Sequence, residues 1–94
     1  MSMCTYQTQT LQVNASAKTA QGWAPMTDAS VYFDHPVHFM ADHALIIDVL
    51  NTDERSRARV GLEMDATSAR ALAEAILRAL ESVPPALRDE SFAH

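Results

Sequence analysis

Three histidines, His35, His38 and His43, lie close together on and beside a short segment that joins two apolar runs. Neutral imidazole is the commonest protein ligand of zinc and also suits copper and iron. If the two apolar runs pair as a hairpin, His35 and His43 face each other near its base, and His38 lies on the loop between them. The sequence therefore predicts a transition-metal site for zinc, copper or iron, although this spacing is not a specific signature.

Cys4 is the candidate fourth ligand, because it comes near the histidines if the first strand runs beside their hairpin. Three imidazoles with an open position are typical of a catalytic metal, whereas four protein ligands are typical of a structural one. The alternative interpretations stay open. In these interpretations the histidines only form hydrogen bonds within the loop, and Cys4 is a small buried hydrophobic side chain.

The composition limits the classes of protein to which the chain can belong. A chain of 94 residues forms one small core, and contents of 48% hydrophobic and 20% charged residues are typical of a folded soluble domain. A net charge of -5, with Lys18 as the only lysine, provides no basic face for nucleic acid or an anionic membrane. A single cysteine and the lack of a long apolar run favour a cytoplasmic protein, and the excess of arginine over lysine favours a bacterial one.

Alternating apolar side chains predict four strands, at residues 3–13, 29–35, 43–50 and 57–64. The third is apolar on both faces, which is typical of a central strand. The small polar residues 14–22 are expected to form a loop.

Helical spacing of apolar residues predicts one helix over residues 66–83, capped by Asp65 and ended by two prolines. The expected domain covers residues 1–83, and residues 84–94 are expected to be a loosely ordered or disordered tail.

A single register makes these elements consistent with one another. With His35 opposite His43 and Val49 opposite Ala58, the large apolar side chains of the sheet gather on one face, where the helix can pack. The helix is expected to contact that face through Leu72, Ile76 and Leu80. The opposite face is expected to carry Asp48 directly across from Arg59, together with Tyr32, Ala44, Ile46 and Leu50. The predicted fold is α+β, a four-stranded antiparallel sheet with one long C-terminal helix on one face.

Several short segments resemble a family of small uncharacterised actinobacterial proteins. These segments are Cys4-Thr5-Tyr6, Gly22-Trp23, residues 31–38 (VYFDHPVH) and Asp42-His43. The resemblance covers most of the chain up to the helix. It implies no activity, because the family has no established function, but it implies that the histidine segment and the Cys-Thr-Tyr start are family features.

Two hypotheses follow from the sequence. The first is a metal-binding protein or metalloenzyme, in which a histidine-ligated transition metal acts on a small molecule. The second is a non-catalytic binding or assembly module, in which the sheet face that the helix leaves uncovered forms a homodimer. The sequence does not decide whether the protein is an enzyme.

Overall fold

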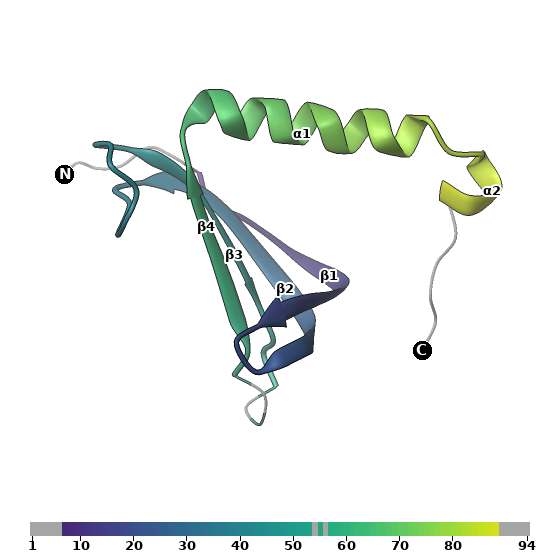
Figure 1. The fold of residues 1–94 in the computed structure, drawn as a ribbon, viewed down its shortest axis with the longest axis horizontal. Helices are drawn as coiled ribbons and strands as arrows, with labels where there is room; N and C mark the ends of the chain where they lie inside the picture. Colours follow the sequence, from purple (N-terminus) through teal and green to yellow (C-terminus); the bar gives the residue numbers. More distant parts are fainter. Residues whose placement is uncertain (1–6, 54, 56, 89–94) are drawn as a thin grey trace.

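The fold is a meander of four strands followed by a helix. The computed structural model describes residues 7–53, 55 and 57–88. Its elements are β1 (Gln9–Thr19), β2 (Gly22–Asp34), β3 (Ala44–Leu50), β4 (Arg59–Met64), α1 (Ala66–Glu81) and α2 (Pro85–Arg88) (Figure 1). The strands form one antiparallel sheet in the order β1-β2-β3-β4. This arrangement confirms the predicted α+β fold.

The first hairpin is longer than the sequence predicts. β1 continues through residues 14–19, where a loop was expected, and β2 already begins at Gly22. Only Ala20 and Gln21 form the turn, and Gly22 has a φ of 109°, which favours glycine. The loop prediction was wrong because β1 is a largely exposed edge strand, so its small polar side chains need no apolar alternation. Residues 3–6 of the predicted strand lie outside the described residues.

The central pairing of β2 with β3 has the predicted register, with Val31 opposite Ile47. The pairing of β3 with β4 differs from the prediction by two residues, since Ile47 faces Leu62 rather than Val60. Side chains alternate between the faces with a period of two, so this shift leaves every side chain on its predicted face.

The two faces of the sheet are buried to different extents. On the face away from α1, Ala44 is 0% exposed and Ile46 is 7% exposed. This is the face that the sequence analysis expected to be uncovered and to form a dimer. The expectation that this face is uncovered was wrong for Ala44 and Ile46, because the chain itself already covers both side chains.

Helix α1 begins as predicted. The carboxylate of Asp65 caps it by accepting a hydrogen bond from the backbone nitrogen of Ser68 at 2.7 Å. α1 ends at Glu81 rather than at residue 83, and α2 forms within the segment expected to be a loose tail, while residues 89–94 lie outside the described residues. No helix in the described part of the chain is long and apolar enough to cross a membrane.

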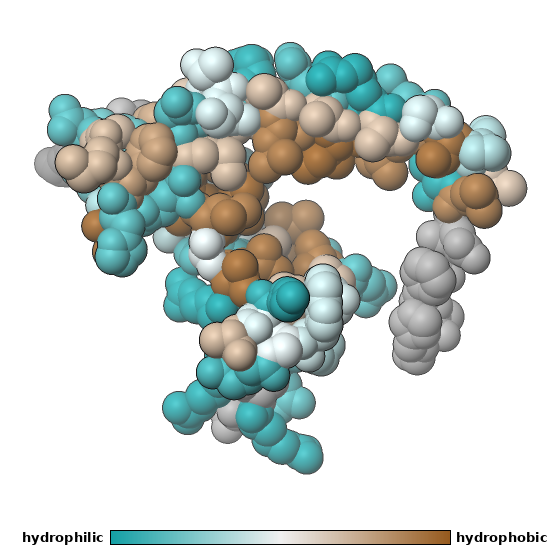
Figure 2. Space-filling view, in the orientation of Figure 1, coloured by the Kyte–Doolittle hydropathy of each residue, from teal (hydrophilic) through white to brown (hydrophobic). Residues whose placement is uncertain are grey.

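Helix α1 starts beside the sheet, and its second half projects past it (Figure 1). None of its residues is buried, and Ile76 and Leu80 are 53% and 45% exposed. The burial expected for Leu72, Ile76 and Leu80 is therefore wrong for the single chain. A cavity of about 590 Å³ separates the apolar side of the helix from the sheet (Figure 2). Its floor is Val31, Leu45 and Ile47.

The burial of Ile46 leads to a stability prediction. Ile46→Ala should lower the free energy of unfolding by about 2–5 kcal/mol, because it leaves a cavity in the best-buried part of the sheet. Val37→Ala is the control, since Val37 is exposed and its truncation should cost less than about 0.5 kcal/mol. Urea unfolding measures both variants, and equal losses would contradict this view of the core.

Candidate functional site

His35 and His43 lie against each other at the base of the β2–β3 hairpin. They directly follow and precede the last paired residues, Asp34 and Ala44. Their ring centres are 4.6 Å apart, with the ring planes tilted by 44°. The ring of His43 is also stacked on Phe33, at 5.8 Å between centres and 8° between planes. The strand pairing thus brings His35 and His43 together at the hairpin base, as the predicted register requires.

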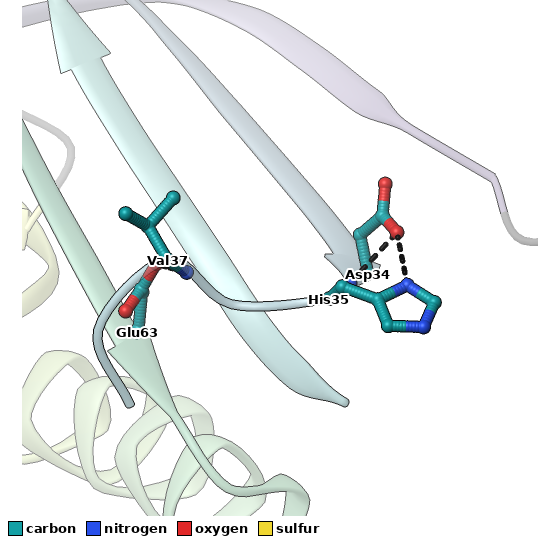
Figure 3. A network of polar contacts seen from close by, with 4 residues as sticks. All are labelled: Asp34, His35, Val37 and Glu63. Atoms are coloured by element: carbon teal, nitrogen blue, oxygen red, sulfur yellow. Dashed lines mark hydrogen bonds and ion pairs between the residues drawn. The ribbon is translucent and has the colours of Figure 1, made fainter. Parts of the chain in front are cut away.

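Asp34 orients His35 from the end of β2 (Figure 3). Its Oδ1 accepts a hydrogen bond from the backbone nitrogen of His35 at 2.7 Å and lies 3.3 Å from the ring Nδ1. The backbone N–H of His35 lowers the pKa of the Asp34 carboxyl, and the His35 side chain lowers it further. An imidazole that donates from Nδ1 to a carboxylate leaves Nε2 as the ligand atom, which is the usual arrangement around bound metals.

His38 is placed by a different contact. Its backbone nitrogen donates to Oε1 of Glu63 at 2.8 Å, and the backbone nitrogens of Val37 and Phe39 donate to the same carboxylate. Among the described residues, no three histidine, cysteine, aspartate or glutamate side chains are grouped so as to hold a metal ion. The structure thus brings together His35 and His43 but not His38, and Cys4 lies outside the described residues.

Glu63 is the functional-site residue that sequence reasoning missed. Its carboxylate ties the loop after β2 to strand β4, and the backbone N–H groups of Val37, His38 and Phe39 lower the pKa of this carboxyl. The alternation of β4 places Glu63 on the same face as Tyr32, which is a signal that it points toward this loop. Nothing in the sequence indicates that three consecutive backbone amides would meet it.

An open cavity of about 670 Å³ lies between this loop and the sheet. On its wall, the Tyr32 hydroxyl donates to Asp48 Oδ2 at 2.8 Å, and this hydrogen bond raises the pKa of Tyr32. Arg59 Nη2 reaches the same oxygen at 3.2 Å. Asp48 pairs with Gly61 across the strands, so the expected position of Arg59 directly opposite was wrong, but Arg59 still forms an ion pair with Asp48 on the diagonal.

His35 lines the same cavity as Asp48, but the two side chains differ in exposure. Asp48 is only 9% exposed, and its carboxylate is paired with Arg59 and accepts a hydrogen bond from Tyr32, as a buried carboxylate requires. The histidine pair is instead at the surface, where the His35 side chain is 75% exposed. The pair is therefore accessible from solvent, whereas Asp48 links neighbouring strands through its contacts with Tyr32 and Arg59.

A family model for a family of unknown function matches residues 3–89 of the chain, which include every helix and strand described above. The chain belongs to this family, DUF6295. No curated protein and no solved structure matches it. The DUF6295 match agrees with the sequence resemblance to an uncharacterised family, and it assigns no activity to the histidine pair or to Glu63.

The contact of Glu63 with the loop predicts a pH-dependent stability. The carboxyl pKa lies below its ordinary value of 4.5 in the folded chain, so the contact stabilises the fold above that value. The stabilisation is lost as the pH falls through the lowered folded-state pKa. Glu63→Gln should therefore be less stable than wild type at pH 7, and the difference should shrink on acidification.

Urea unfolding as a function of pH measures this difference. Glu81→Gln is the matched control, because Glu81 is exposed at the end of α1 and its substitution should leave the pH profile unchanged. Hydrogen exchange at the amides of residues 37–39 should also become faster in Glu63→Gln. Unchanged exchange there would contradict the assigned role of Glu63.

Proposed function

We propose that the protein is a non-catalytic assembly module that works as a homodimer. The observation that carries the proposal is the apolar side of α1, which lies exposed above an equally apolar part of the sheet (Figure 2). Leu77, for example, is 58% exposed. A monomer rarely leaves a contiguous apolar surface of this kind uncovered, and such surfaces usually mark a protein interface.

The total surface area supports the same proposal. The chain exposes 7531 Å², whereas a compact monomer of 10.3 kDa exposes about 5,400 Å². This total counts all residues, so the excess of roughly 2,000 Å² is not assigned to α1 alone. A standard interface needs about 800 Å² from each partner, which is smaller than this excess.

The contact surface in this proposal differs from the one expected from sequence. The face carrying Ile46 is covered by the chain itself, which leaves α1 and the sheet face with Val31, Leu45 and Ile47. A second copy carries the same two surfaces. It can therefore cover both at once in a closed, two-fold arrangement, which is the commonest form of soluble oligomer.

Sedimentation velocity tests the homodimer. Wild-type protein should sediment as a dimer, and Leu77→Glu should shift it toward monomer by placing a charge in the apolar contact. Ala71→Glu is the control, because position 71 lies on the polar side of the helix by its spacing and receives the same charge. A wild-type protein that stays monomeric at all concentrations would overturn the proposal.

A second candidate function, metal binding, is favoured by the geometry of His35 and His43. Two imidazoles that bind one tetrahedral zinc at about 2.1 Å have ring centres roughly 5 Å apart, close to the observed 4.6 Å. We propose His35 and His43 as the first two ligands of a zinc, copper or iron ion, with Cys4 and His38 as further ligands. That this segment is a feature of actinobacterial relatives stays a prediction, as does any reaction on a small molecule.

Elemental analysis and metal titration test this second candidate. His35→Ala and His43→Ala should each weaken binding of added zinc by at least about tenfold, whereas His94→Ala should not. Binding should also weaken on acidification, because ligation requires neutral imidazole. If all three variants bind zinc, copper and iron like wild type, the histidine pair serves only to stack and hydrogen-bond at the hairpin base.

A further inference from the structure

The apolar side of α1 has an uneven distribution of side-chain size. Three of the four residues on its first half are alanines, at positions 66, 69 and 73, with Leu72 as the exception. The second half carries Ile76, Leu77 and Leu80, and Val83 lies two residues beyond the end of the helix at Glu81. The small half lies over the sheet and borders the cavity, and the second half projects past the sheet (Figure 1).

We propose that two copies pair through α1 in antiparallel order, about a two-fold axis that passes between Glu74 and Ala75. This inference rests on the proposed homodimer and specifies how it is built. The register brings three small positions level with large ones: Ala66 with Val83, Ala69 with Leu80, and Ala73 with Ile76. Leu72 comes level with Leu77, which is a pair of two large side chains. One register thus matches a small with a large side chain in three of the four pairs, and each pair occurs twice because the interface is isologous.

The charged residues of α1 fit the same register. Arg70 comes level with Ala79, Arg78 with Ala71, and Glu81 with Ser68. Glu74 comes level with Ala75. No charge is therefore level with a like charge of the other copy. A parallel, in-register pairing would instead bring each charged residue level with its own copy, which is unfavourable.

The cavity supplies a place for the incoming helix. The alanines on its roof leave room for the large side chains of another copy, and helices with small residues at their contact approach closely. Beneath them lie Val31, Leu45 and Ile47 of the sheet. The projecting half of each helix would then cover the cavity of the other copy. In this way the dimer buries surfaces that the single chain leaves open (Figure 2).

Residues 89–94 are a poorer occupant of this surface than a second α1. Beyond α2, residues 89–94 contain one large apolar side chain, Phe92. The apolar side of a 16-residue helix is about 24 Å long, so a single aromatic ring cannot cover it. A second α1 supplies four large apolar side chains at the required spacing.

A size-swap experiment tests the register. Ala69→Leu places leucine against leucine and overfills the contact, while Leu80→Ala places alanine against alanine and leaves a gap. Each single variant should raise the dimer dissociation constant roughly tenfold or more. The double variant Ala69→Leu/Leu80→Ala restores one small and one large side chain at both contacts between positions 69 and 80. Its dissociation constant should return to within roughly threefold of wild type.

Sedimentation equilibrium gives these constants, and circular dichroism checks that each variant keeps its helix. If the wild type is a dimer but the double variant weakens it by the combined effect of the two single changes, the register is overturned. The homodimer itself would stand. A monomeric wild type would overturn both proposals.

Cysteine cross-linking gives an independent readout in a Cys4→Ser background. Mixed Ala69→Cys and Leu80→Cys chains should form a disulfide between different chains, and neither variant should do so alone. In the antiparallel pair, the two copies of position 69 are about 16 Å apart along the axis, too far for a disulfide. Ala71→Cys mixed with Leu80→Cys is the control. Self-linking of Ala69→Cys would indicate parallel helices and overturn the inference.

Discussion

The pairing of β2 with β3 is the constraint on which the rest of the structure depends. Because side chains alternate along each strand, the contact of Val31 with Ile47 determines which face every neighbouring residue occupies. It places Ile46 on the covered face and Leu45 on the face toward α1. The same pairing, continued by one step past its last hydrogen-bonded residues, brings His35 to His43.

Asp48 explains why this pairing does not slip. A charge at the centre of a sheet is costly unless its partners are in place, and here Tyr32 and Arg59 both reach one carboxylate oxygen. Gly61 lies opposite and leaves room for the other oxygen, since an added Cβ would stand 3.2 Å from it. A slip of one residue would carry Asp48 to the apolar face toward α1, away from both partners.

The sequence predicted those features of the fold whose physical cause leaves a clear pattern of residues. The two-sided apolar run of β3 and the capped helix after Asp65 were predicted because burial and helix capping leave clear patterns. The β3–β4 register was two residues off because alternation is unchanged by such a shift. The extension of β1 was missed because an exposed edge strand carries no apolar pattern. His38 was misplaced because Glu63 acts on backbone amides, which every sequence has.

The helix presents the opposite situation, because the described part of the chain leaves its apolar side largely uncovered. A helix of 16 residues is only marginally stable in water without tertiary contacts, and of the α1 residues only Ala69 is even half-buried. If a second copy covers the apolar side, forming α1 and forming the dimer become one linked equilibrium. The stability of the helix would then rise with protein concentration, while the sheet around Ile46 would depend on it far less. Helix and sheet would thus respond differently to dilution, because each has a different source of burial.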